Sequence, residues 1–235
     1  MRIVIDAGHG PETAGKRTPD GSMREYEFNS AVAQYVADLL LHGYEGVEFI
    51  LTHDDSRDVP LQERTDRANS WGADLFVSIH ANAAGAGWSP AGGIETYVYT
   101  TRPAAAVALA NAVQRQLVRA TGLADRGVKS ADFHVLRETK MTAILIECGF
   151  MTNRTEAELL KSDEFRRTCA AAIVAGIAET YGLRPKQQPP VKDWKQESVE
   201  WLHTQGLTDT VRDPDTLPTW AELGAVLRKV GVKMR

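Results

Sequence analysis

The sequence begins with the stretch MRIVIDAGHG (residues 1–10), and this stretch decides the fold class. Its centre, Ile3 to Ile5, is a continuous apolar run. Such a run is typical of a strand that is buried on both faces, as strands are in a parallel sheet covered by helices. The run gives way to a Gly-His-Gly sequence, so His9 stands where a strand ends.

Two later stretches repeat this design. Residues 75–79 (LFVSI) lead into His80, and residues 143–146 (AILI) lead into Glu147. Ligands of open α/β sheets bind in the crevice outside the carboxyl ends of the strands. We therefore expect one site that contains the side chains of His9, His80 and Glu147.

Helical and strand patterns alternate between these stretches, which favours an α/β fold. Further strands are expected at residues 47–52, 94–99 and 133–137, and helices at 28–43, 60–71, 103–121 and 163–181. The alternation within 94–99 favours a strand with one exposed face or an edge position. A capping box of Thr155 and Glu158 is expected ahead of the last helix. The prediction is a mostly parallel, twisted sheet of about six strands with helices on both faces.

A proline-rich, polar segment at residues 184–192 predicts a semi-stiff linker. It separates a domain at 1–183 from a small helical C-terminal module at 193–235. The elements expected in that module are a helix at 194–205, a turn at Asp213-Pro214-Asp215 and a helix opened by a capping box of Thr219 and Glu222.

Composition excludes several classes of protein. The 235 residues are 43% hydrophobic and 25% charged, which is ordinary for a globular protein, and the formal net charge of −4 disfavours nucleic acid as a partner. No run of 18 apolar residues is present, so stable membrane insertion is not expected. The first residues lack the pattern of a signal peptide, so we expect synthesis in the cytoplasm. Two cysteines, Cys148 and Cys169, rule out a disulfide framework and an all-cysteine zinc site.

The residues at the strand ends have the chemistry of a zinc hydrolase. Histidine nitrogens and carboxylate oxygens are standard zinc ligands, and a catalytic zinc keeps three protein ligands and a water. His9, Glu25 and His80 would supply such a set. Glu147 would take a proton from water and return it to a leaving nitrogen, so the reaction class would be hydrolysis of an amide. From spacing alone, polar residues that merely end strands remain an alternative, because the helical HExxH motif is absent.

Four motifs follow one another along the chain. They are IDAGHG (5–10), EYEFN (25–29), SIHAN (78–82) and IECGFMTN (146–153). In this order, over about residues 1–182, they resemble the zinc-dependent N-acetylmuramoyl-L-alanine amidases of bacteria and phages, the amidase-3 family. The resemblance implies a phosphorylase/hydrolase-like fold, one Zn2+ ion held by His9, Glu25 and His80, and Glu147 as the catalytic residue. It also implies the substrate, which is the amide between N-acetylmuramic acid and L-alanine in peptidoglycan.

Two glutamates compete for the second ligand position. Glu25 precedes Asn29 by four residues, as in the family pattern. Glu27 is therefore expected to be a solvated or structural carboxylate, since residues two apart on a helix do not share a face.

Four other polar residues near the motifs have open roles. His53 is expected to cap a strand and His134 to be a packed, hydrogen-bonded ring, with a place in the crevice as the alternative for each. Asn82 and Asn153 are expected to hold loops, with substrate contact as the alternative.

The resemblance predicts an endolysin-like enzyme that lyses bacterial cell walls. A zinc peptidase that cuts the stem peptide and a non-catalytic wall-binding protein are the alternative functions. A phage endolysin released through a holin-type pore fits the absent signal pattern, and a host enzyme for mother-cell lysis is the second choice. The C-terminal module is similar to repeats found after the linker in phage endolysins and related to surface-layer homology repeats. It is expected to bind the cell wall, or else to be a helical appendage that stabilises the amidase domain.

Overall fold

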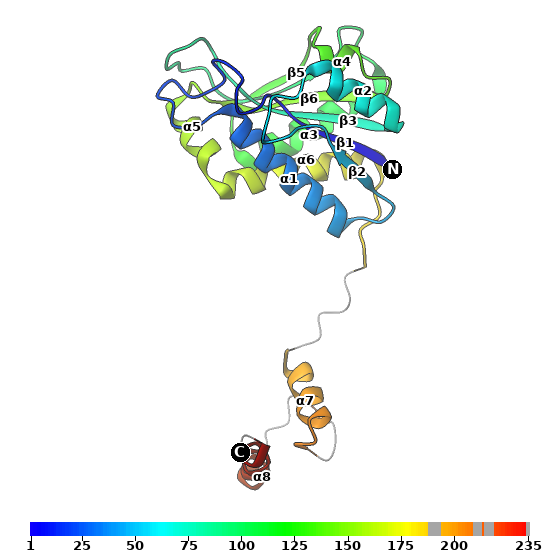
Figure 1. The fold of residues 1–235 in the computed structure, drawn as a ribbon, viewed down its shortest axis with the longest axis vertical. Coiled ribbons are helices and arrows are strands. Elements are labelled where there is room, and N and C mark those ends of the chain that lie inside the picture. The colour runs from blue at the N-terminus through cyan, green and yellow to red at the C-terminus, as the bar shows by residue number, and fades with distance from the viewer. Residues whose placement is uncertain (188–193, 209–212, 214–218, 234–235) are drawn as a thin grey trace. The chain divides into compact units, whose positions relative to one another are not determined.

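The computed structural model describes residues 1–187, 194–208, 213 and 219–233. The chain divides into two compact units, Met1–Lys186 and Gln187–Arg235, which are drawn in Figure 1. Residues 188–192 of the expected linker lie outside the described residues, as do Pro214 and Asp215 of the expected turn.

The larger unit is built around a six-stranded sheet (Figure 1). The strands are β1 (Arg2–Ala7), β2 (Glu48–Leu51), β3 (Leu75–Asn82), β4 (Ile94–Val98), β5 (Asp125–Ser130) and β6 (Thr142–Phe150). Their order across the sheet is β2-β1-β3-β6-β4-β5. The first four in this order are parallel, while β4 runs antiparallel to β6 and β5 runs parallel to β4. The predicted mostly parallel sheet of about six strands is confirmed.

Helices connect most of the strands and follow the last one. Their bounds are α1 (Glu25–Gly43), α2 (Leu61–Trp71), α3 (Ala104–Thr121), α4 (His134–Arg137), α5 (Arg154–Lys161), α6 (Asp163–Tyr181), α7 (Trp194–Thr204) and α8 (Trp220–Lys233). Three of the helices, α2, α3 and α6, end at a glycine in the left-handed conformation, namely Gly72, Gly122 and Gly182.

Both faces of the sheet are covered, because successive side chains of a strand point to opposite sides. Ile3 and Ile5 of β1 belong to the larger core, which includes residues of α1, α3 and α6. Val4, between them, belongs to a second core with residues of α2 and α4. Figure 1 shows α1 and α6 below the sheet and α2 and α4 above it. The continuous apolar runs in the sequence therefore mark the central strands.

The prediction of a strand at 133–137 is wrong. His134 and the following residues form α4, in which the amides of Leu136 and Arg137 both donate to the carbonyl of Phe133 at 3.0 Å. The remaining strand of the sheet is β5, whose sequence DRGVKS contains no apolar run. Because β5 lies at the edge of the sheet and is only partly buried, it does not need the pattern that identifies a central strand.

The expectation that residues 94–99 form a strand with one exposed face or at an edge is also wrong. β4 lies inside the sheet, between β6 and β5. Glu95, on the side of β4 that the sequence suggests is exposed, is only 3% exposed. Arg126 and Lys129 of β5 pair with its carboxylate. A strand whose charged residue is buried in an ion pair therefore shows the same alternation of apolar and polar residues as a strand with one face in solvent.

The capping box expected from Thr155 and Glu158 is replaced by a different cap. The side chain of Asn153 accepts hydrogen bonds from the amides of Thr155 and Glu156 and begins α5. Glu158 instead pairs with Lys161 at 2.5 Å. Asparagine is among the preferred N-cap residues, so the start of this helix lies two residues before the predicted box.

The smaller unit contains α7 and α8, which match the two helices expected there. The capping box of α8 is present, because the Thr219 amide donates to Glu222 Oε2 at 2.8 Å and the Glu222 amide donates to Thr219 Oγ1 at 3.2 Å. Two large aromatic side chains of this unit, Trp201 and Trp220, are 58% and 88% exposed.

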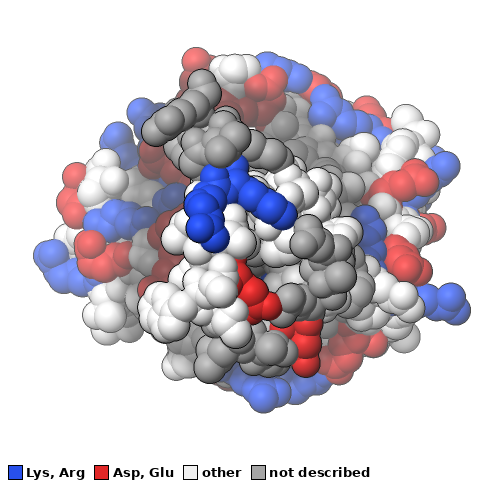
Figure 2. Space-filling view, turned by 90° about the horizontal axis from the view of Figure 1, so that it is seen from below, with Lys and Arg blue, Asp and Glu red and all other residues white. Residues whose placement is uncertain are grey.

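The surface charge has no single sign on the face that Figure 2 shows. Basic and acidic side chains are intermixed around this view, in agreement with the small net charge of −4. Among the described residues, no helix has both the length and the apolar character needed to cross a membrane.

Candidate metal centre

His9 lies just beyond the end of β1, where the backbone is held from two sides. The amide of Gly8 donates to the carbonyl of Ile79 in β3 at 3.0 Å. The guanidinium of Arg64 donates to the carbonyl of His9 at 2.8 Å. His9 has a φ angle of 65°, in the left-handed region that costs free energy for a residue with a side chain and that occurs often at functional sites. These contacts keep the His9 ring next to the ring of His80, with 5.1 Å between the ring centroids.

His80 and Glu147 are neighbours on adjacent strands. His80 lies opposite Glu147 in the parallel pairing of β3 and β6. Phe76 and Leu145, an even number of residues earlier on the same strands, belong to the core beneath α2 and α4. His80 and Glu147 therefore lie on that face of the sheet.

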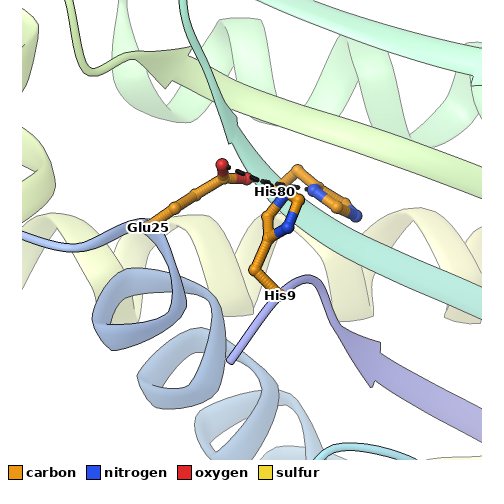
Figure 3. A group of neighbouring side chains, drawn as sticks. All are labelled: His9, Glu25 and His80. Carbon is orange, nitrogen blue, oxygen red and sulfur yellow. Dashed lines mark hydrogen bonds and ion pairs between the residues drawn. The ribbon is translucent and has the colours of Figure 1, made fainter. Parts of the chain in front are cut away.

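Glu25 is the first residue of α1 and completes the cluster (Figure 3). Its Oε2 lies 3.2 Å from Nε2 of His9, and its Oε1 lies 3.0 Å from Nδ1 of His80. One ligand atom from each of the three residues lies within 4.8 Å of the other two. The structure therefore brings together the three side chains that the sequence suggests as metal ligands.

Glu25, and not Glu27, is the glutamate beside the histidines. The Glu25 side chain is 2% exposed, whereas Glu27 is exposed and accepts a hydrogen bond from the Arg24 amide at 2.6 Å. Glu27 therefore caps α1. Asn29, one turn after Glu25, donates to the carbonyl of Gly8 at 2.9 Å and to Glu25 Oε1 at 3.3 Å, so it ties the start of α1 to the end of β1.

Burial and charge set the protonation of the three residues. Burial lowers the pKa of His9 to about 4 against the opposing charge of Glu25, so this ring is neutral at pH 7. Burial also disfavours charge on His80, but the hydrogen bond and the charge of Glu25 outweigh it and raise the pKa of His80. For Glu25, burial is outweighed by the hydrogen bond and charge of His80, and its pKa is lowered. The cluster thus has a buried carboxylate between two rings, an arrangement that a cation stabilises.

Glu147 is held in a different protonation state. Burial raises its pKa to about 8, and the charge of His80 opposes this only in part. The Oε2 atom of Glu147 is buried and accepts no hydrogen bond from any described residue. A carboxyl group whose pKa lies near neutrality is well suited to accept and return a proton at pH 7.

A cleft of about 580 Å³ lies beside the cluster and includes His9, His80 and Glu147 in its lining. Lys16 adds a positive charge to this lining. The apolar part of the wall is formed by Val59, Pro60, Leu61, Phe133, Val135 and Leu145. The cleft therefore offers apolar surface directly beside the polar cluster.

The two histidines with open roles have different surroundings. His53 lies with its Nε2 3.3 Å from the hydroxyl of Ser30, and burial lowers its pKa. His134 is on α4 and not on a strand. It lines the cleft, and its Nε2 lies 3.4 Å from the hydroxyl of Thr65.

Both asparagines with open roles make structural hydrogen bonds. Asn82 donates to Glu95 at 2.5 Å, which links β3 to β4. Asn153 caps α5. Neither residue lines the cleft beside the cluster.

A buried ion pair lies behind the cluster, at a place that the sequence pattern does not predict. Arg64 Nη1 lies 2.8 Å from Asp6 Oδ1, and each side chain is 2% exposed. Arg64 is in the polar helix α2, where charged residues usually face solvent, so the sequence of α2 does not indicate that Arg64 is buried. The sequence of β1 does indicate that a partner is needed, because an acidic residue such as Asp6 within a buried apolar strand requires one.

Asp6→Asn is expected to lower the free energy of unfolding by about 3–5 kcal/mol at neutral pH, because it leaves Arg64 buried without its partner. Burial opposes the charge on Asp6, but Arg64, Ser78 and Thr52 outweigh it and hold its pKa below the usual 3.8. Since the folded pKa is depressed, the stabilisation is complete above the unfolded pKa and is lost as the pH falls through the folded pKa.

Urea unfolding of the wild type and of Asp6→Asn, from neutral pH down through the pKa of Asp6, measures the difference in the free energy of unfolding. The difference in free energy should be constant above about pH 5 and should shrink below about pH 4. A difference that does not change with pH would contradict an ionised, paired Asp6.

Gly8→Ala is expected to lose metal binding. An added Cβ would lie 2.0 Å from Cε1 of His80, so the ring would have to leave its position. We expect the metal affinity to fall by at least about tenfold, as when the support of a ligand is lost. Gly87→Ala is the matched control, because a Cβ there meets no atom within 4 Å, and it should bind metal as the wild type does. Equal metal content in the two variants would contradict the assignment of a packing role to Gly8.

Comparison with known proteins agrees with the geometry. Residues 3–179 match the family described as N-acetylmuramoyl-L-alanine amidase. The chain is 36% identical over 183 residues to the N-acetylmuramoyl-L-alanine amidase CwlM of Bacillus licheniformis, and this alignment covers 78% of this chain and 70% of the relative. It is 36% identical over 205 residues to an endolysin of Bacillus phage SPP1, and this alignment covers 83% of this chain and 72% of the relative.

A solved structure has the same fold. The catalytic domain of CwlV, an N-acetylmuramoyl-L-alanine amidase from Bacillus (Paenibacillus) polymyxa var. colistinus, aligns with a TM-score of 0.72 and 37% identity. The alignment covers 78% of this chain and 99% of that domain. With this fold and the family match over residues 3–179, the chain belongs to the N-acetylmuramoyl-L-alanine amidase family.

Proposed function

We propose that this chain uses a zinc ion, held by His9, Glu25 and His80, to hydrolyse the amide between N-acetylmuramic acid and L-alanine in peptidoglycan. Family membership supplies the reaction. The observation that carries the metal assignment is the convergence of two imidazoles and one buried carboxylate within 4.8 Å, from three separate elements.

The donor set fits zinc. Two histidine nitrogens and one carboxylate oxygen form a common ligand set of catalytic zinc, which keeps a fourth position open. A bound zinc ion would supply a Lewis acid that polarises a carbonyl and lowers the pKa of water. The neutral ring of His9 needs to release no proton for binding, and the carboxylate of Glu25 supplies a compensating negative charge.

Glu147 is proposed as the residue that moves the proton. It is adjacent to His80 in the sheet, lines the cleft and has a buried oxygen that no described residue uses. In its carboxylate form it would accept the proton of the attacking water. It would then return that proton to the nitrogen of the departing L-alanine as the carbon–nitrogen bond breaks.

The cleft fits a substrate with both apolar and polar parts. The apolar wall that includes Leu61 and Phe133 suits the methyl groups of the lactyl and alanyl units beside the scissile amide. Lys16, on the same lining, is placed to attract a carboxylate of the stem peptide.

The products of digestion distinguish the proposed amidase from a zinc peptidase. Purified peptidoglycan treated with the full chain and zinc should release peptides whose new amino terminus is L-alanine, together with free lactyl carboxyl groups on muramic acid. New amino termini within the stem peptide would identify a peptidase. No new termini would identify the non-catalytic alternative, which the presence of Glu147 in the cleft disfavours.

The biological setting that we propose is cell-wall lysis of the endolysin type. One relative is a phage endolysin, and the substrate of the family is a component of the bacterial wall. Zinc-dependent lysis of intact walls by the purified chain, and its loss with a chelator, tests the cofactor and the setting together.

The smaller unit is proposed to bind the cell wall. It lies beyond residues 3–179 that match the family, and it exposes Trp201 and Trp220, side chains that commonly stack on sugars. Binding would raise the local concentration of the amidase on its polymer.

This proposal is tested with two proteins that both carry Glu147→Gln, so that the wall stays intact. One is the full chain and the other ends at Lys186, the last residue of the larger unit. Cosedimentation with purified walls should retain the full chain more strongly, and Trp220→Ala should weaken that retention. Equal retention, with a lower melting temperature for the shorter protein, would indicate a stabilising appendage instead.

A further inference from the structure

The carboxylate of Asp6 accepts hydrogen bonds from three side chains that are far apart in the sequence. Its Oδ1 accepts from the hydroxyl of Thr52 at 2.5 Å and from Arg64 at 2.8 Å. Its Oδ2 accepts from the hydroxyl of Ser78 at 2.6 Å. Because Arg64 neutralises it in a buried site, Asp6 is ionised and has no proton to donate.

Ser78 links this carboxylate to His80. Its Oγ lies 3.1 Å from Nε2 of His80. A hydroxyl group has one proton, and that of Ser78 is committed to Asp6. The Ser78 oxygen can therefore only accept from His80, which requires a proton on Nε2.

The other nitrogen of His80 then faces the metal cluster. Nδ1 lies 3.0 Å from Oε1 of Glu25, the carboxylate that also approaches His9. In a neutral imidazole only one nitrogen carries a proton. When Nε2–H is bonded to Ser78, a proton on Nδ1 is donated to Glu25, and this proton is the one that a bound metal ion would replace. Nδ1 would then supply the lone pair.

We propose that Asp6 and Ser78 are positioning residues that fix His80 as the Nε2–H tautomer, so that Nδ1 is the atom that binds the metal. This inference rests on the proposed metal site. It gives a buried series of contacts, from Arg64 through Asp6 and Ser78 to the ring of His80, the role of orienting that ring.

The same ion pair also holds the second histidine. Arg64 donates to the carbonyls of Ala7 and His9 from the guanidinium that neutralises Asp6. One buried pair thus orients the His80 ring through a hydroxyl and the His9 backbone directly. Outer contacts of this kind typically contribute a factor of about 10–100 to metal affinity.

The test compares two substitutions, each of which removes a hydroxyl group that donates a hydrogen bond to Asp6. Ser78→Ala removes the acceptor of Nε2–H, and Thr52→Val removes a hydroxyl that bonds to the other oxygen of the same carboxylate. Zinc affinity of the full chain is measured by competition with a chelator, without substrate. Ser78→Ala should weaken zinc binding by about 10–100-fold, while Thr52→Val should change it by less than about threefold. Equal losses in the two variants would overturn the inference.

Nitrogen NMR of the zinc-loaded, 15N-labelled chain gives a second readout, with the His80 signals assigned by their loss in His80→Asn. The wild type should show a proton on Nε2 and none on Nδ1, and Thr52→Val should show the same. A proton on Nδ1 in a wild type that binds one zinc ion and cleaves peptidoglycan would overturn the inference and leave the proposed function intact. A wild type that binds no zinc would overturn both.

Discussion

Glu147→Gln is expected to lower kcat by about 10²–10⁴-fold while the metal content stays at the wild-type level. Glutamine keeps the size and one oxygen of the side chain but cannot accept a proton from water or return one to the leaving nitrogen. The loss should appear in kcat more than in KM, because the proton moves in the reaction and not in binding. Release of L-alanine termini from peptidoglycan and metal analysis of the same sample measure the two quantities.

Glu158→Gln is the matched control for this substitution. Glu158 is a largely exposed residue of α5 that pairs with Lys161, and the change should leave activity within about twofold. A Glu147→Gln enzyme with more than half of the wild-type kcat would show that another group moves the proton.

His80→Ala is expected to abolish both metal binding and activity. It removes one of three proposed ligands and also the 3.0 Å contact between that ligand and the buried carboxylate of Glu25. The fall in zinc affinity should exceed the factor of about 10–100 that the loss of an outer contact costs. Activity should fall to the level that the wild type shows in excess chelator.

His42→Ala controls for the loss of an imidazole as such. His42 is exposed in the last turn of α1, so the variant should keep the metal content and activity of the wild type. Retention of one zinc ion per chain by His80→Ala would exclude His80 as a ligand. The contrast with Glu147→Gln, which should keep its metal, separates the holding of the ion from the movement of the proton.

The sequence predicts the centre of the sheet better than its edge. β1, β3 and β6 are buried on both faces over most of their length and therefore contain largely apolar runs. β5 is an edge strand with partial burial, and nothing in the sequence DRGVKS distinguishes it from a loop. The interior position of β4 was hidden because Arg126 and Lys129 of β5 neutralise Glu95. Pairing across strands decides these two cases, and such pairing is invisible in a single sequence.

The same limit applies to the site. The positions of His9, His80 and Glu147 follow from strand ends, since the carboxyl ends of parallel strands share one edge of the sheet. The placement of Glu25 needed the motif as well, because the first turn of a helix also offers Glu27. Arg64 could not be found from its own surroundings in the sequence. It reaches Asp6 across 58 positions, and only the packing of α2 on the sheet brings the two together.

Because activity depends on the register between β3 and β6, the activity of the enzyme measures how many molecules have folded with the correct strand pairing. Side chains on a strand alternate between faces, so a slip of one residue would carry Glu147 to the side of the sheet away from His80 and the cleft. Misaligned chains would keep nearly the same helix and strand content and yet have no turnover. Recovery of hydrolysis after refolding from urea therefore counts only the molecules in which β3 and β6 are paired in the native register, whereas recovery of the circular dichroism signal counts the misaligned molecules too.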